Sequence, residues 1–129
     1  MAGLVGIAAA PDFTSWGFSD AQKRTIREEG RLVEHSPYGE QPYVTTRIFW
    51  ESGEGLKLLG GEIGVDRPVR LLHGLEDPDV PWQISLRLTE RLRSADVQML
   101  LVKGGDHRLS RDADVALLLR TVAALLEEL

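Results

Sequence analysis

The sequence predicts an α/β fold in which about three parallel strands carry flanking helices, with a helical insertion after the first strand. Three short runs rich in Val, Leu and Ile, at residues 3–9, 69–73 and 97–102, have the length of buried strands. After Pro68, strand and helix patterns alternate, which is the order that builds a parallel sheet. Residues 14–61 follow neither pattern, and this contrast predicts the insertion.

The first run, GLVGIAA at residues 3–9, is apolar throughout and therefore predicts a strand buried on both faces. The segment that follows is rich in aromatic residues and is interrupted by Gly and Pro. Within it, Ser19 predicts the start of a helix that ends at Gly30, and residues 45–59 predict a second helix. We therefore expect residues 14–61 to form helices and loops rather than more sheet.

The C-terminal half is more regular. Residues 69–73 predict a strand that ends at Gly74, and Pro81 suits the first position of a helix. Residues 97–102 predict another strand, after which Ser110 is expected to cap a final helix. The apolar stripe of that helix consists of Val115, Leu118, Leu119, Val122 and Leu125.

Composition excludes several classes of function. The 129 residues are enough for one small domain, and a formal net charge of −5 with scattered Lys and Arg argues against nucleic acid or an anionic membrane surface as partners. Without cysteine the chain has no disulfide, no thiolate metal site and no cysteine nucleophile. Residues 1–10 lack the positive charge of a signal peptide, so we expect a strand there and a cytoplasmic protein.

Two loops carry the candidate chemistry. A strand–helix–strand crossover is right-handed and places its two strands side by side and parallel, so the loops HGLEDPDVPW (73–82) and GGDHRLS (104–110) should leave the same edge of the sheet. Asp77 and His107 should then face each other. A carboxylate that accepts from one imidazole nitrogen leaves the other free to take a proton from a hydroxyl, so this pair is two thirds of a nucleophilic triad.

At these residues the chain resembles the C-terminal portion of an α/β-hydrolase. The motifs are GLVGIAAAPDF, then HGLEDPDVPW with Asp77 in the pattern HGxxDxxVP, then VQMLLVKGGDHRLS with His107 after the last strand. Within that superfamily AAPDF, SPYGEQPYV and HGLEDPDVPW are similar to the palmitoyl-protein thioesterase/acyl-glucuronide esterase branch and its bacterial relatives. The resemblance implies residues 1–13 and 62–129 as the hydrolase core and 14–61 as the cap, or lid.

The resemblance also implies a Ser-His-Asp mechanism without metal or cofactor, in which Asp77 is the acid and His107 the base. The family's nucleophile sits in a GxSxG turn between a strand and a helix, and no serine of this chain has that context. We therefore expect the nucleophile to lie outside this chain.

Each of these residues has a simpler interpretation. Asp77 could be an ordinary turn residue before a helix, and Asp79 has the better claim to that role. His107 could be a solvated loop histidine, although its place directly after a strand favours the functional role. Asp106 could tune His107 but is expected to face solvent. A metal site of Asp77, Asp79, Asp106 and His107 lacks any compact ligand motif, and we do not expect one.

The remaining candidates carry weaker signals. His73, next to Gly74 at a strand end, is expected to bond local backbone, and His35 is expected in a surface loop. Several aromatic side chains could line an acyl pocket, although packing inside the insertion explains them as well. The candidates for substrate contact are Trp16, Phe49, Trp50 and Trp82.

Two functional hypotheses follow. In the first, the chain is part of a serine hydrolase that acts on small or acylated carboxylic esters or thioesters. In the second, it is a non-catalytic fragment that forms a homo-oligomer or complements a partner, because a sheet of few strands exposes apolar edges. A shortened gene, with the nucleophile encoded upstream of Met1, would also account for the missing motif.

Overall fold

A three-stranded parallel sheet organises most of the chain in the computed structural model, which describes residues 1–129. The strands are β1 (Leu4–Ile7), β4 (Val69–Gly74) and β5 (Val97–Val102), in the order β1-β4-β5. In register, Leu4 lies beside Val69, and Val69 in turn lies beside Val97. This is the parallel α/β arrangement predicted from the sequence.

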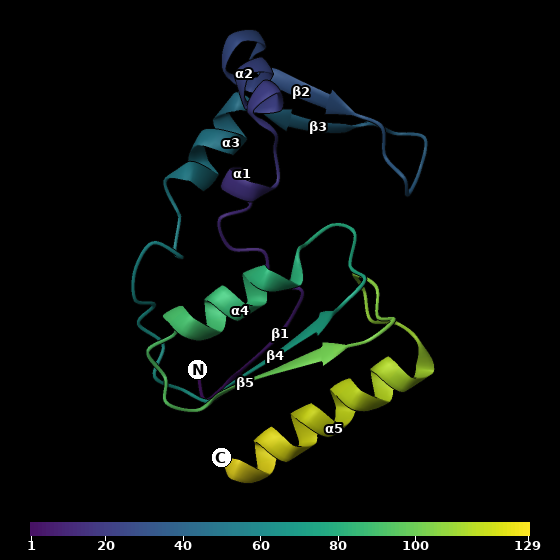
Figure 1. Cartoon of the computed structure of the whole chain (residues 1–129). Helices are drawn as coiled ribbons and strands as arrows, with labels where there is room; N and C mark the ends of the chain where they lie inside the picture. The colour runs from purple at the N-terminus through teal and green to yellow at the C-terminus, as the bar shows by residue number, and fades with distance from the viewer. The chain divides into compact units, whose positions relative to one another are not determined.

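The chain divides into two units, which are described separately. The sheet unit comprises Met1–Pro11 and Leu58–Leu129, and the hairpin unit comprises Asp12–Lys57 (Figure 1). The sequence places the expected cap at residues 14–61, which overlaps the hairpin unit; its role as a cap stays a prediction. No helix in either unit combines the length and the apolar character needed to cross a membrane.

The strands of the sheet unit differ in burial. Every residue of the central strand β4 is buried, because β1 and β5 cover both of its edges and helices cover its faces. β1 has a neighbour along one edge alone, and Leu4 and Ile7 are 39% and 37% exposed. The expectation that β1 is buried on both faces is therefore wrong.

Two helices pack on opposite faces of this sheet, α4 (Trp82–Arg91) and α5 (Asp112–Glu128), as Figure 1 shows. α4 buries Ile84 and Leu88 at helical spacing. Pro81 lies at its N-cap, one position before the predicted place, because its φ of −59° comes with an extended ψ of 133°. Of the predicted α5 stripe, Leu125 is buried, whereas Leu119 is 64% exposed.

The start of α5 differs from the prediction. Its N-cap is Arg111 rather than Ser110. Asp114, in the first turn, accepts from the Arg111 backbone amide at 3.3 Å and from the guanidinium at 2.8 and 3.0 Å. The hydrogen bond from the Arg111 side chain is the main reason that the pKa of Asp114 is lowered. A charged pair thus begins this helix in place of a serine hydroxyl.

In the hairpin unit, the first predicted helix forms as expected. α1 (Phe13–Trp16) is a single turn, and α2 (Asp20–Glu29) begins at Ser19 with a capping box. The Ser19 hydroxyl accepts from the Gln22 amide at 3.1 Å, and the Gln22 side chain accepts from the Ser19 amide at 2.9 Å. Gly30 ends α2 with a φ of 82°, a conformation that favours glycine.

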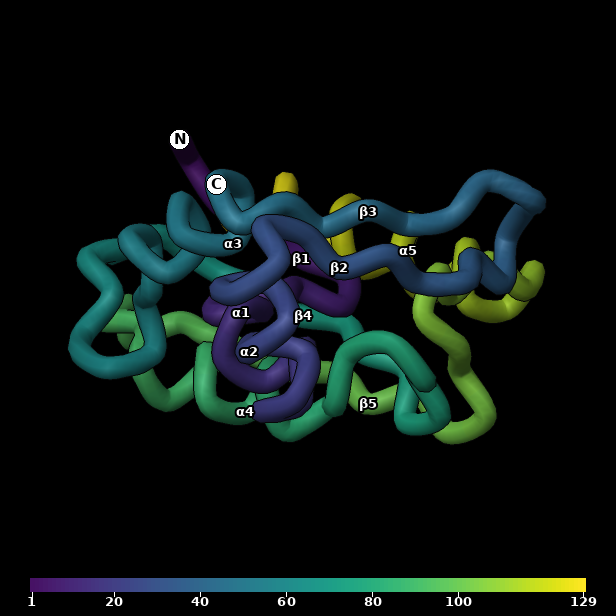
Figure 2. The backbone as a smooth tube through the Cα atoms, turned by 90° about the horizontal axis from the view of Figure 1, so that it is seen from above, coloured from purple at the N-terminus to yellow at the C-terminus, as the bar shows by residue number.

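The rest of this unit contains an antiparallel hairpin that the sequence analysis did not predict. β2 (Arg31–Glu34) pairs with β3 (Tyr43–Thr46), and Figure 2 shows the two running side by side. Thr45 and Thr46, expected in a helix, belong to β3, where β-branched side chains fit well. The helix α3 (Arg47–Glu54) follows directly, with the Thr46 hydroxyl accepting from the Phe49 amide at 3.1 Å.

Candidate active site

Backbone contacts join the loops that follow β4 and β5. The Leu75 amide donates to the Val102 carbonyl at 2.9 Å, and the Glu76 amide donates to the Gly105 carbonyl at 3.0 Å. Gly74 lies so close to the second loop that a Cβ there would fall 2.3 Å from the Asp106 carbonyl oxygen and 2.4 Å from that of Gly105. Because glycine has no Cβ, Gly74 lets the backbones of the two loops come into direct contact.

Asp77 lies in the first loop, and its carboxylate is fully enclosed, with 0% of the side chain exposed. One oxygen, Oδ1, accepts from the amides of Asp79 at 2.8 Å and Val80 at 2.9 Å. The other, Oδ2, lies 2.9 Å from Nδ1 of His107. Both oxygens are thus held, one by the start of the turn into α4 and the other by the imidazole.

Opposing effects act on the acid–base equilibrium of Asp77. Burial alone would raise the pKa of this carboxyl, because removal from water disfavours the charged form. The hydrogen bonds from Val80, His107 and Asp79 outweigh burial and lower the pKa below its usual value of 3.8. Asp77 is therefore a carboxylate at neutral pH and acts as a hydrogen-bond acceptor.

One ring nitrogen of His107, Nδ1, is bonded to Asp77. A carboxylate can only accept, so in the neutral ring the proton lies on Nδ1 and the lone pair on Nε2. The side chain is 36% exposed, and Nε2 makes no hydrogen bond within the chain. This is the tautomer that an imidazole needs to take a proton from a hydroxyl group.

A tight turn follows His107. Leu109 adopts a φ of 47°, and its amide donates to Oδ1 of Asp106 at 2.9 Å. Asp106 is exposed, as expected, and its carboxylate serves this turn. The structure thus brings Asp77 and His107 into contact, while their catalytic role stays a prediction.

The carboxylates near His107 also raise the question of a metal ion. Ligand atoms of Asp77, Asp79 and His107 lie within 4.8 Å of one another. Oδ1 of Asp77 already accepts two amides and Oδ2 faces an imidazole, so their lone pairs point at hydrogen-bond donors. This donor set fits a hydrogen-bonded acid better than a metal ligand.

His73 makes the expected contact with local backbone and a second contact with a side chain of α4. Its Nε2 lies 2.8 Å from the Val80 carbonyl oxygen, a local backbone bond of the predicted kind. Its Nδ1 lies 2.6 Å from Oγ of Ser85, in the first turn of α4. The sequence analysis missed Ser85, because a serine inside a helical pattern carries no signal for a partner on a strand.

The aromatic candidates fall into the two units. Trp50 is 5% exposed and donates through Nε1 to the Thr14 carbonyl at 3.3 Å, so it packs inside the hairpin unit. Phe49 is 57% exposed, with its ring centroid 5.7 Å from that of Phe13. Trp16 is half-buried in α1, and Trp82 is half-buried at the start of α4 in the sheet unit. Their contact with substrate stays a prediction.

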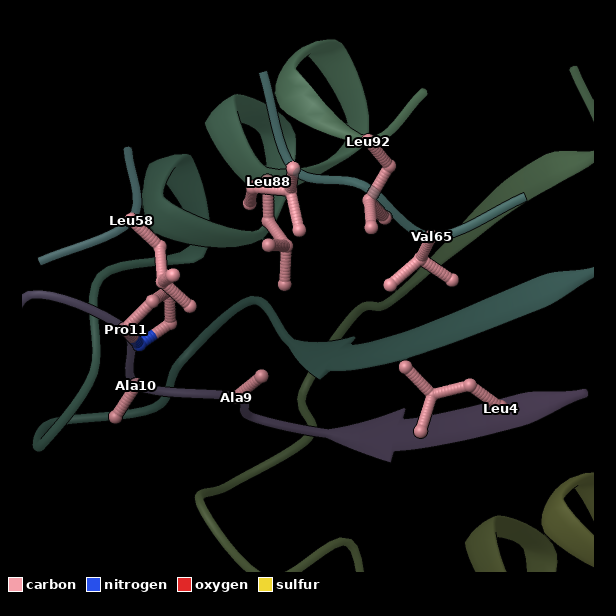
Figure 3. A pocket seen from close by; sticks show the side chains of 9 residues that line it. Leu4, Ala9, Ala10, Pro11, Leu58, Val65, Leu88 and Leu92 are labelled. Carbon is pink, nitrogen blue, oxygen red and sulfur yellow. The ribbon is translucent and has the colours of Figure 1, made fainter. Parts of the chain in front are cut away.

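An apolar pocket of about 380 Å³ lies within the sheet unit, next to β1 (Figure 3). Figure 3 shows Leu88 of α4 and Leu92, the residue after that helix, on one side and Leu4 and Ala9 on the other. Ala10, Pro11, Leu58, Ile63 and Val65 complete its lining. The hollow therefore adjoins β1, one of the two edge strands of the sheet.

Known proteins resemble this chain over almost its entire length. It is 38% identical to mouse and 35% identical to human palmitoyl-protein thioesterase ABHD10, mitochondrial, over 98% of the chain. It covers 44% and 42% of those proteins, so the chain spans less than half the length of these curated relatives. No model of a protein family matches the chain.

Solved structures of known proteins also resemble this chain. A putative hydrolase from Agrobacterium vitis S4 superimposes with a TM-score of 0.87 at 39% identity, over 96% of this chain and 49% of that one. Mouse α/β-hydrolase domain-containing protein 10 gives 0.87 at 36% identity, over 98% and 52%. Est1E from Butyrivibrio proteoclasticus, at 14% identity and a TM-score of 0.70, shares the fold.

The parallel sheet, the aspartate and histidine at its carboxyl edge and these likenesses define a class: the chain has about half of the α/β-hydrolase fold. Within that class, it is similar to the ABHD10 palmitoyl-protein thioesterases and to the Agrobacterium hydrolase.

Proposed function

We propose that this chain contributes the acid and the histidine of a serine hydrolase that cleaves carboxylic esters or thioesters. The observation that carries the proposal is the 2.9 Å contact between Oδ2 of Asp77 and Nδ1 of His107 at the carboxyl edge of a parallel sheet. His107 takes the proton of a serine hydroxyl during attack and returns it to the leaving group. Asp77 orients the imidazole and stabilises its charged form.

The nucleophilic serine, in this proposal, comes from outside residues 1–129. Ser85 is buried against His73, and Ser36 is buried with its hydroxyl accepting from the Tyr38 amide. The Ser19 hydroxyl caps α2, and the Ser94 hydroxyl accepts a hydrogen bond from the Asp96 amide. Ser15, Ser52 and Ser110 make no hydrogen bond to His107.

The likeness to ABHD10 supports a long acyl thioester as substrate. Fusing the chain to the N-terminal half of the Agrobacterium relative supplies a complete fold in which p-nitrophenyl esters and an S-acylated peptide can be compared. We expect turnover of both, and a fall in kcat of roughly 10⁴-fold or more for His107→Ala, because the general base is lost. His35→Ala, at an exposed loop position, is the control and should leave kcat unchanged. A His107→Ala fusion as active as the unsubstituted one would contradict the proposal.

A second function is favoured by the open edge of β1. We propose as the alternative that the chain acts as a non-catalytic half-fold that associates through this edge with a second copy. Leu4 and Ile7 are partly exposed there, and the apolar pocket adjoins them. Gel filtration of the chain and the ester assay of the fusion together separate the two functions, because association of the chain combined with an inactive fusion supports the alternative.

A further inference from the structure

A second imidazole lies behind the Asp77 carboxylate. His73, the penultimate residue of β4, has 0% of its side chain exposed, and its Nε2 lies 3.5 Å from Oδ2 of Asp77. This is the same oxygen that accepts from His107. Two histidines thus face one carboxylate oxygen, one from the protein interior and the other from the exposed side.

The hydrogen bonds of His73 determine its tautomer. The Val80 carbonyl can only accept, so Nε2 carries the proton. In a neutral ring Nδ1 then accepts, and the Ser85 hydroxyl must be its donor. His73 therefore has its proton on Nε2, whereas His107 has its proton on Nδ1.

Ser85, His73 and Asp77 follow one another as a serine, a histidine and an acid would in a triad. Ser85 is 1% exposed and His73 is 0% exposed, so no substrate reaches this hydroxyl. The arrangement has another use. Val80 donates its amide to Oδ1 of Asp77 and accepts at its carbonyl from His73, so both peptide groups flanking this residue are held.

We propose that His73 is a positioning residue: anchored to α4 by Ser85, it holds the Val80 peptide and the carboxylate of Asp77 so that Oδ2 faces Nδ1 of His107 and sets the tautomer of that ring. The inference rests on the proposed function, in which His107 must present a bare Nε2. His73 itself touches neither substrate nor nucleophile. Its effect reaches the reaction through Asp77.

The chain is well suited to a direct test, because it contains three histidines, His35, His73 and His107. Long-range ¹H–¹⁵N spectra of the full chain, at a pH where the rings are neutral, distinguish the two tautomers of each ring. His35→Gln identifies the exposed ring and serves as the control that leaves the others unchanged. We expect the Nε2–H pattern for His73 and the Nδ1–H pattern for His107.

Substituting His73 by glutamine or by asparagine tests its two hydrogen bonds separately. Glutamine places its side-chain nitrogen near the position of Nε2, so His73→Gln can still donate to Val80 and should keep the Nδ1–H pattern of His107. Asparagine reaches only the position of Nδ1, so His73→Asn can bond Ser85 but not Val80. In this variant the His107 signals should shift to those of a mixed tautomer.

Ser85→Ala is the milder variant, should His73→Asn fail to fold. It retains the ring but removes its anchor on α4, and it should shift the His107 signals part of the way. An unchanged Nδ1–H pattern of His107 in either variant, with native circular dichroism, overturns the proposal. The spectra do not depend on ester turnover, so an inactive fusion would count against the proposed function and leave this inference standing.

Discussion

At the scale of single residues, the hydrogen bonds of the Asp77 carboxylate depend on its negative charge. Two amides and an imidazole hold it, and its pKa is lowered despite burial. A carboxyl whose pKa is lowered by folding stabilises the protein at pH values above its unfolded pKa, about 3.8 here. That contribution is lost as the pH falls through the lower pKa of the folded state.

We therefore expect Asp77→Asn to remove part of the acid dependence of stability. The difference in free energy of unfolding between the unsubstituted protein and the variant should be largest above pH 4 to 5, roughly, and should shrink below it. Urea unfolding at several pH values measures this difference. Glu90→Gln, at an exposed carboxylate of α4 without a hydrogen-bond partner in the chain, should follow the unsubstituted protein at each pH. A constant difference for Asp77→Asn across the series would contradict the prediction.

The pairing of Asp77 with His107 could be predicted from the sequence, whereas the contact between His73 and Ser85 behind it could not. One right-handed crossover brings the ends of β4 and β5 to the same edge, and strand patterns locate those ends in the sequence. The contact between His73 and Ser85 depends on how a helix packs over a strand and on the rotamers of both side chains. Neither is encoded in hydrophobic periodicity.

At the scale of elements, the residues that cap the helices contribute to the stability of the protein. The reciprocal Ser19–Gln22 capping box satisfies two amides at the start of α2. Ser19→Ala should lower the free energy of unfolding by about 1 kcal/mol, as loss of an N-cap usually does. Urea unfolding followed by circular dichroism measures it.

Ser52→Ala provides the matched control for that substitution. It also replaces an exposed serine by alanine, but inside α3 rather than at a cap. Because alanine favours helix interiors, stability should stay the same or rise slightly. Equal losses in the two variants would show that the cap of α2 contributes nothing of its own.

The elements that escaped prediction are the short ones. β2 and β3 have four residues each, too few for alternation to be distinguished from loop. Arg111 does not have the small polar side chain of a typical N-cap, so Ser110 next to it was the more natural choice. Longer elements such as α2 and β5 were predicted within a residue or two, because their periodicity extends over more positions.

At the scale of the whole molecule, the open edge of β1 should decide whether copies associate. If the second proposed function holds, gel filtration should give an apparent mass above that of one chain. Leu4→Lys should then restore the mass of one chain, since a charge at a strand edge opposes pairing. Ile48→Lys, at a position of the hairpin unit that is 80% exposed, is the control and should change nothing. Equal elution of all three proteins at the mass of one chain would exclude this function.

The glycine contact at position 74 has a consequence for the order in which the molecule folds. It lets the loops after β4 and β5 touch, and the contact between Asp77 and His107 closes a segment of 30 residues that lies inside one strand–helix–strand crossover. Closing so short a segment costs little chain entropy, and contacts close in sequence form early. The acid and the histidine should thus come together when β4 pairs with β5.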